Sequence, residues 1–153
     1  MKTRHQQAGF TLIELVFVIV ILGILAAFAV PRFVDLTGQA RTASANALEG
    51  SLRSASALTH AVALATGQTG ATGTVTADGG TTIDMVHGYP AGTATGIVAA
   101  LQDLNGYTAT ANATTPPSVT IAVDGAPGAC TITYEEPSAA NDTPDITPAL
   151  GGC

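Results

Sequence analysis

Basic residues are scarce in this chain of 153 residues, which has five Lys and Arg against eleven Asp and Glu and a formal net charge of −6. Lys2 and Arg4 precede the first apolar segment, and the other three cations are Arg32, Arg41 and Arg53. Proteins that bind nucleic acid need clustered Lys and Arg to neutralise phosphates. The sequence therefore argues against nucleic-acid binding through a basic patch.

Aromatic residues are also few and unevenly placed. The chain has no Trp, and its four Phe lie within the first 33 residues, which leaves Tyr89, Tyr107 and Tyr134 as the aromatic residues of the remainder. Ala, Thr, Gly and Ser dominate that remainder. A domain of this composition has a thin hydrophobic core, so we expect it to depend on packing against a long helix and on a covalent crosslink.

The sequence lacks the motifs on which common catalytic and metal sites are built. It contains no Cys-x-x-Cys pair, no Gly-x-Ser-x-Gly element and no glycine-rich phosphate-binding loop. His5, His60 and His87 do not show the spacing of paired metal ligands. We therefore expect no enzymatic activity, no catalytic residue, no cofactor and no metal.

One oxygen-rich segment leaves an alternative open. Asn141, Asp142 and Asp145 could bind calcium as a cluster of oxygen ligands, although their spacing is not that of an EF-hand and a solvated acidic loop explains them better. Asn112 and Asn141 also begin Asn-x-Thr patterns, which match the glycosylation acceptor sequence but arise by chance in a Thr-rich chain.

A basic leader followed by an apolar segment dominates the N-terminus. Residues 10–30 contain a single charged residue, Glu14, and about 20 apolar residues suffice to cross a bilayer as a helix. Lys2 and Arg4 precede this segment, whereas Arg32 and Asp35 after it offset each other. The positive-inside rule then places the N-terminus in the cytoplasm and the rest of the chain outside.

The string Gly9-Phe10-Thr11-Leu12-Ile13-Glu14-Leu15, with its leader and apolar span, resembles the N-terminus of type IV pilins and pseudopilins. The resemblance implies that a prepilin peptidase cuts after Gly9 and that Phe10 becomes the methylated N-terminal residue. It also implies that Glu14 is the family's assembly glutamate, and that Gly23 and Pro31 are its helix breakers. An ordinary secretory signal has its apolar segment before the cut, whereas here the anchor would stay on the mature chain.

Glu14 is the unusual residue of the apolar segment. A charge at the bilayer centre costs roughly 2.5–3.5 kcal/mol by insertion scales, so intramembrane carboxylates are rare and usually functional. A plain single-span anchor explains neither Glu14 nor the Gly9–Phe10 junction. Among packed helices, the free α-amino group of a cleaved Phe10 would be a suitable partner. The alternative is that the carboxylate snorkels to the headgroups. Both can apply, with snorkelling before assembly and pairing with the amine after it.

Helical periodicity predicts that the first helix continues beyond the span and ends before Gly67. The apolar residues that recur at this spacing are Leu48, Leu52, Ala55, Leu58, Val62 and Ala65. We expect one helix from Phe10 to Thr66, with residues 10–30 as membrane span and filament core and residues 31–66 as its amphipathic half. Pro31 predicts a kink, and in assembled pili of the family the stretch from Gly23 to Pro31 can lose helicity.

Residues 67–153 are expected to form a small head. Alternating residues indicate strands at 118–123 and 129–135, joined by a turn, and a further strand at 107–111. We also expect a strand or turn at 81–86, a turn at 87–90 and a helix at 93–104, with irregular structure at 68–80 and 136–148. The predicted fold class is α+β, a pilin fold in which the long helix packs on a small antiparallel sheet.

Two cysteines, Cys130 and Cys153, both fall in the part of the chain expected to be exported. In an oxidising compartment such a pair is expected to form a disulfide. The bridge would close a loop of about two dozen residues and would contribute roughly 3 kcal/mol in the chain-entropy view.

Motifs in the head narrow the resemblance to pilins of the mannose-sensitive haemagglutinin type. They are Gly88-Tyr89-Pro90-Ala91, Thr95-Gly96-Ile97-Val98-Ala99-Ala100-Leu101, Cys130-Thr131-Ile132-Thr133-Tyr134 and Cys153. The resemblance implies the major subunit of a type IV pilus, whose partners are further copies in a helical filament, the inner membrane before assembly, the prepilin peptidase/methyltransferase, the assembly platform and a motor ATPase. The fibre would serve adhesion and, with a retraction motor, movement.

Two alternatives stay open from the sequence. The first is a pseudopilin of a type II secretion system, against which the cysteine pair argues and for which a calcium requirement would argue. The second is a membrane-anchored binding or enzymatic domain that keeps its leader and does not polymerise.

Overall fold

A computed structural model describes residues 10–153 of the protein, and describes side chains for residues 10–28 and 36–153. The expected leader with Gly9, and the side chains of residues 29–31 at the end of the expected span, lie outside these described parts. The chain divides into two compact units, residues 1–38 and 39–153, which are described separately below.

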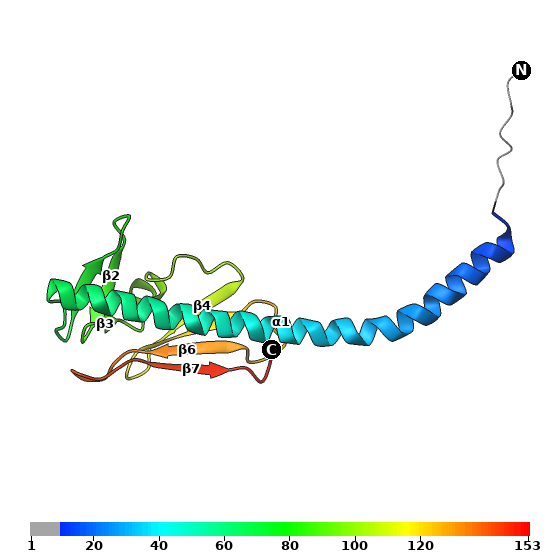
Figure 1. Ribbon diagram of the computed structural model, residues 1–153. Coiled ribbons are helices and arrows are strands. Elements are labelled where there is room, and N and C mark those ends of the chain that lie inside the picture. Colours follow the sequence, from blue (N-terminus) through cyan, green and yellow to red (C-terminus); the bar gives the residue numbers. More distant parts are fainter. Residues whose placement is uncertain (1–9) are drawn as a thin grey trace, which may run out of the picture. The chain divides into compact units, whose positions relative to one another are not determined.

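One helix, α1, runs from Leu12 to Thr66 and belongs to both units (Figure 1). The expectation of a continuous helix is confirmed to within two residues at its start, and α1 includes both Gly23 and Pro31. The predicted apolar stripe was wrong in its second half, because Leu48 and Leu52 are buried whereas Leu58, Val62 and Ala65 are exposed. The kink at Pro31 and the loss of helicity in a fibre stay predictions. At the other end Gly67 has φ of 71°, and the Gln68 N–H donates to the Ala63 carbonyl at 2.8 Å, which is a Schellman stop.

In the described part of the chain, no helix carries an apolar stretch long enough to cross a bilayer. The predicted transmembrane span over residues 10–30 is therefore not confirmed.

Two antiparallel sheets make up the β structure of the second unit. The first, in the order β1-β2-β3, consists of β1 (Gly73–Thr76), β2 (Thr82–Val86) and β3 (Tyr89–Pro90). The second, in the order β4-β5-β6-β7, consists of β4 (Tyr107–Asn112), β5 (Ser118–Val123), β6 (Thr131–Glu135) and β7 (Asp145–Ala149). The α+β class and the strands at β2, β4, β5 and β6 are confirmed, whereas the expectation of one sheet was too simple.

Two segments expected to be irregular are strands. β1 forms because Gly79 and Gly80, with φ of 95° and 86°, permit a tight reversal into β2, which places Val75 opposite Ile83 in the buried layer. β7 forms although it contains Pro148, because it is the outer strand of its sheet, where a missing N–H is tolerated. Its Ile146 is buried opposite Tyr134.

The helix expected at 93–104 was wrong. The structure has only a π-helical segment, η1 (Ala94–Val98), within which Gly96 has non-helical φ and ψ of −97° and −106°. The apolar residues that suggested the helix do pack on the core, since Ile97 is fully buried and Val98, Leu101 and Leu104 contact the same cluster. Their spacing therefore reflected core packing rather than helical structure.

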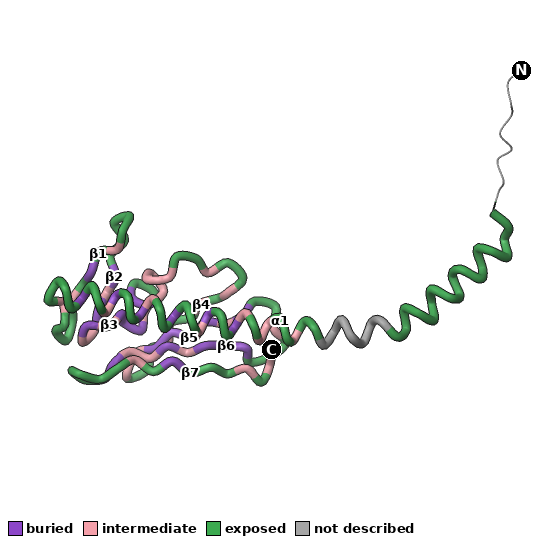
Figure 2. The backbone as a smooth tube through the Cα atoms, in the orientation of Figure 1, coloured by how far each residue is buried: buried purple, intermediate pink, exposed green. Residues whose placement is uncertain are grey.

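The main core lies between the buried side of α1 and the four-stranded sheet (Figure 2). Its buried members are Ala45, Leu48, Leu52, Ile97, Val119, Ile121, Val123, Cys130, Ile132, Tyr134 and Ile146. A smaller cluster joins α1 to the first sheet through Ala63, Val75, Ile83 and Met85. The thin core expected from the composition is thus organised around one helix face.

Polar and covalent contacts add to this packing. The Tyr107 hydroxyl donates to the Ser44 carbonyl at 3.1 Å, and the Arg53 guanidinium donates to the Ile146 carbonyl at 3.3 Å, so that both outer strands are tied to α1. The expected disulfide is confirmed between Cys130 and Cys153, 23 positions apart. It fixes the segment after β7 next to β6, where the Gly152 N–H also donates to the Ala129 carbonyl at 2.8 Å.

Gly92 and Gly50 form a matched pair for testing the packing around η1. A Cβ on Gly92 would collide with the Pro117 carbonyl oxygen and lie 2.7 Å from its carbon, whereas a Cβ on Gly50 meets nothing within 4 Å. We expect Gly92→Ala to destabilise the fold by about 1–3 kcal/mol, and Gly50→Ala to stabilise it by up to roughly 1 kcal/mol because Ala favours helix. Urea unfolding of both variants measures this; equal stabilities would contradict the close approach at Gly92.

Tyr134 makes the stability of the head depend on alkaline pH. Its side chain is fully buried and its hydroxyl donates to the Pro90 carbonyl at 2.7 Å. Burial raises the pKa of the phenol well above its usual value, and the Ser56 hydroxyl lowers this pKa to a smaller extent. The folded state therefore keeps a proton that the unfolded chain loses near pH 10.

The stabilisation linked to Tyr134 is complete below about pH 10 and is lost as pH rises toward the folded-state pKa. We expect the free energy of unfolding to fall there by up to roughly 1.4 kcal/mol per pH unit from this group. Urea titrations from about pH 8 to about pH 11 should show the decline in the parent chain and in the control Tyr107→Phe, and a shallower decline in Tyr134→Phe. An unchanged slope in Tyr134→Phe would contradict the assignment.

Candidate functional site

The N-terminus of α1 brings Thr11 and Glu14 together as a reciprocal cap. The Thr11 backbone N–H and hydroxyl donate to Glu14 Oε2 at 2.9 and 2.8 Å, and the Glu14 backbone N–H donates to the Thr11 hydroxyl oxygen at 3.3 Å. Thr11 is thus the N-cap of α1, and Glu14 is the third helical residue. This is the capping-box arrangement, which satisfies backbone donors that a helix start leaves unpaired.

The cap fixes the Glu14 carboxylate at the first turn without enclosing it. Both bonds from Thr11 end on Oε2, so Oε1 has no partner among the described residues. The carboxylate is exposed, and it also lies at the positive end of the helix dipole. It is therefore oriented and free to accept a further donor from outside the chain.

The surroundings of this carboxylate are apolar and uncovered. Every residue from Phe10 to Phe28 is exposed, and the large side chains include Phe10 at 92% and Phe28 at 76%. Contiguous apolar surface of this extent marks a site of contact with a membrane or another protein. Within the described residues this segment is exposed along its whole length.

The structure places the other expected site residues as follows. Phe10 precedes the cap, and within the described residues the hydrogen bonds to the Glu14 carboxylate come from Thr11; pairing of Glu14 with the amine of a cleaved Phe10 stays a prediction. Gly23 lies in the helix interior with nothing within 4 Å of a Cβ position. Gly9 and the side chain of Pro31 lie outside the described parts.

Thr11 is the residue that the sequence reasoning missed. Its signal is present in the chain as Thr-x-x-Glu immediately before an apolar run, which is the capping-box pattern. That pattern gives Glu14 a structural role in the helix start in addition to its expected role in assembly.

The acidic segment considered for calcium shows ordinary hydrogen bonding. Asp142 accepts from the Ser138 hydroxyl and the Thr143 N–H, and Asp145 accepts from the Thr147 hydroxyl. No group of His, Cys, Asp or Glu in the described part of the chain is arranged to hold a metal ion. The calcium alternative finds no support in this geometry.

His60 and His87 have structural surroundings. The His60 ring stacks on Tyr89 at 3.9 Å between centroids, and its Nδ1 lies 2.7 Å from the Gly88 carbonyl oxygen. His87 and Gly88, with φ of 51° and 83°, make the two-residue turn from β2 into β3. The expectation of a turn at 87–90 is thus confirmed over its first two residues.

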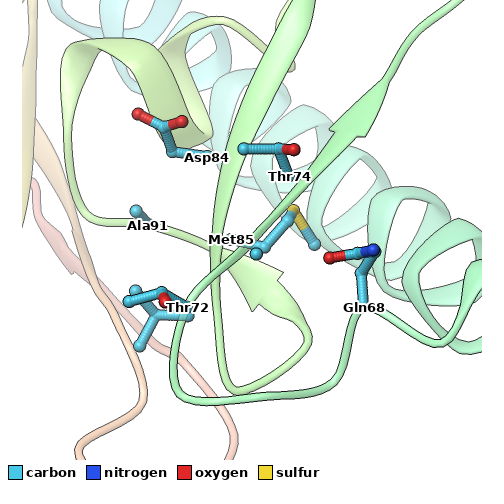
Figure 3. A pocket seen from close by; sticks show the side chains of 8 residues that line it. Gln68, Thr72, Thr74, Asp84, Met85 and Ala91 are labelled. Atoms are coloured by element: carbon cyan, nitrogen blue, oxygen red, sulfur yellow. The ribbon is translucent and has the colours of Figure 1, made fainter.

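An open cavity of about 450 Å³ lies beside the first sheet (Figure 3). Its lining consists of Gln68, Thr72, Gly73, Thr74, Asp84, Met85, Val86 and Ala91. Asp84 is its one titratable group, so the cavity has no paired acid and base with which to carry a reaction.

Residues 4–30 match the family described as the prokaryotic N-terminal methylation motif. Gly9, Phe10, Glu14 and Gly23 all fall within this match. The motif thus coincides with the capped, uncovered start of α1.

Curated relatives extend the similarity. The chain is 49% identical over 87 residues to the type IV narrow pilus major component PilA5 of Thermus thermophilus. The aligned region covers 57% of this chain and 63% of that protein. It is 58% identical over 38 residues to the type II secretion system core protein G of Pseudomonas aeruginosa, covering 25% and 27%. It is 47% identical over 50 residues to the type IV major fimbrial protein FimA of Dichelobacter nodosus, covering 33% and 31%.

The matched regions span less than two thirds of each of these relatives. No solved structure is significantly similar to the chain. The expected resemblance to type IV pilins is confirmed as homology, since two of these relatives are named as a pilus component and a fimbrial protein. These relatives do not distinguish the mannose-sensitive haemagglutinin class.

The cap predicts a measurable effect on the start of α1. Thr11→Val keeps the shape of the side chain but removes the hydroxyl, so we expect a loss of about 0.5–2 kcal/mol in local helix stability, with Thr11→Ser close to the parent chain. Amide hydrogen exchange of the first helical turn in detergent micelles reports it. Parent-like protection in Thr11→Val would show that the helix start does not need the cap.

Proposed function

We propose that this chain is the structural subunit of a type IV pilus, made as a membrane-held precursor and polymerised into a surface fibre. The observation that carries the proposal is the exposed apolar start of α1 with an oriented carboxylate, in the same residues that match the methylation motif. The homology to fimbrial and pilus components supports it. The function is non-catalytic and requires no cofactor.

Processing would begin with removal of residues 1–9. Cleavage after Gly9 would create a free amine on Phe10, which the peptidase/methyltransferase would then methylate. The apolar segment over residues 10–30 would hold the mature subunit in the inner membrane, with its head outside. A platform and motor ATPase would move it from lipid into the fibre.

Assembly would exchange one set of neighbours for another at each exposed group. The apolar side chains from Phe10 to Phe28 would leave lipid and pack against the same segments of other copies. The Glu14 carboxylate would leave headgroups or water and accept from the N-terminal amine of a neighbour through its unoccupied Oε1. A carboxylate buried without that partner would cost several kcal/mol, so the pairing favours subunits in correct register.

The fibre would serve attachment to surfaces and, where a retraction motor is present, movement. Among the pilins, we assign the chain to the mannose-sensitive haemagglutinin class because of its head motifs around Tyr89 and Cys130. The scarcity of cations disfavours nucleic acid as a ligand of the fibre.

A pseudopilin of a type II secretion system is the second candidate, favoured by the 58% identity over 38 residues to core protein G. The Cys130–Cys153 disulfide, and the absence of a metal-binding cluster among the described residues, make it the weaker one. It predicts a processed chain that stays in the cell envelope and is absent from sheared surface fibres.

Variants at residue 14 separate the charge from the cap. Glu14→Gln keeps an amide oxygen for the capping box but cannot pair with an amine, and Glu14→Ala removes both functions. We expect normal membrane levels and a loss of sheared fibres in both variants, since removing one partner of a buried pair costs about 3–5 kcal/mol.

Glu49→Gln is the matched control, because it removes the same charge from an exposed pair with Arg53 on the same helix and should leave the fibre yield unchanged. Quantitative immunoblots of sheared and envelope fractions provide the measurement. Parent-like fibre yield from Glu14→Gln would remove the proposed role of the carboxylate.

A further inference from the structure

The last turns of α1 carry apolar side chains with no partner in the chain. Leu58 is 70% exposed, Leu64 is 59% exposed and Val62 is 37% exposed. In the described residues of the second unit these are the large hydrophobic side chains that remain exposed, and the others of this kind lie between Phe10 and Leu36. Leu58 and Val62, together with the exposed Ala61 and Ala65, form a surface that we call the helix-end patch, whereas Leu64 lies on another side of the helix.

The patch lies on the side of α1 that the sheets do not cover. Leu58, Val62 and Ala65 follow one another at steps of four and three, which places them on one face of a helix. Leu52, Thr59 and Ala63 are buried on the opposite side. Exposed and buried positions accordingly alternate along this part of α1 (Figure 2). A solvated helix face normally carries charged or polar residues, and here it carries none between Arg53 and Thr66 except Ser54.

The charge of the head limits what this patch can contact. Beyond Arg53 the chain has eight Asp and Glu and no Lys or Arg. The two cations of the second unit are engaged within the chain, Arg53 with Glu49 at 2.7 Å and Arg41 with the Cys153 carbonyl oxygen at 3.4 Å. Two such heads carry net charge of the same sign, and each has only these two Arg side chains, by sequence, with which to form ion pairs between them.

We propose that the helix-end patch is a contact between subunits in the fibre, occupied by a second copy of this chain. An uncharged apolar surface on one head is where an acidic neighbour meets the least repulsion, and every copy carries it. The same helix carries the apolar segment through which the copies would assemble. A patch that meets a different surface of the next copy generates an open helical polymer. This inference rests on the proposed pilus function and extends it from the apolar start of α1 to the heads.

A photocrosslinker tests the identity of the occupant. The experiment introduces p-benzoylphenylalanine in place of Leu58 in the full chain, irradiates sheared fibres, and locates the adduct by mass spectrometry. We expect covalent dimers and larger multimers of this chain in fibres, and none in envelopes of the assembly-deficient Glu14→Ala variant. Adducts with a different protein, or intact fibres without chain-to-chain adducts, would overturn the proposal.

Two substitutions provide a matched comparison in the same fibres. Leu58→Asp and Ala139→Asp add the same charge to exposed positions, one in the patch and one in the turn before β7. We expect the sheared fibre yield to fall by about tenfold or more in Leu58→Asp, because this variant loses a buried leucine contact between subunits. The yield should stay unchanged in Ala139→Asp. Formation of the Cys130–Cys153 disulfide and parent-like thermal unfolding would show that the head is intact.

The outcomes separate the two proposals. Absence of fibres from the parent chain would overturn the pilus function itself, and the patch contact with it. Parent fibres together with parent-like yield from Leu58→Asp would overturn the patch contact alone and leave the pilus function standing.

Discussion

The burial of one face of α1 is the constraint on which the head depends. Ala45, Leu48 and Leu52 enter the same cluster as Ile121, Ile132 and Tyr134, so helix and sheet share a single core. With few aromatic residues in the head, neither part could bury enough apolar surface alone. The disulfide and the contacts from Tyr107 and Arg53 then hold the outer strands against this helix.

The helix presents different surfaces in its two units, and the difference is what links fold to function. In the second unit α1 is buried on one face, while from Phe10 to Phe28 it is exposed all round. A helix that is apolar on every side needs other molecules as its environment. Lipid and neighbouring copies would both meet that need, so under the proposed function one segment would serve first as an anchor and later as a fibre core. Glu14, which Thr11 orients, is the charged residue of this segment, and under the proposed function its pairing with a neighbour's amine would make the contact between copies specific.

Sequence reasoning recovered the features that depend on local patterns. The long helix, its glycine stop, the hairpin of β5 and β6 and the disulfide each follow from periodicity, turn residues or compartment. It failed where tertiary pairing overrides local preference. β1 depends on Ile83 opposite Val75, and β7 on an outer position that tolerates Pro148. Residues 93–104 looked helical because Ile97, Leu101 and Leu104 all face the core.

Within the site, the role of Thr11 was predictable from the Thr-x-x-Glu pattern. The unoccupied Oε1 of Glu14 could be recognised only from the structure.

The most direct test of this account is the intact mass and N-terminal sequence of the protein in sheared surface fibres under non-reducing conditions. The account predicts a chain that begins at methylated Phe10 and is lighter by two hydrogens for the Cys130–Cys153 bridge, since processing, export and polymerisation would then be seen in one molecule. A chain that keeps residues 1–9, or one absent from the fibres while a processed form stays in the envelope, would contradict it.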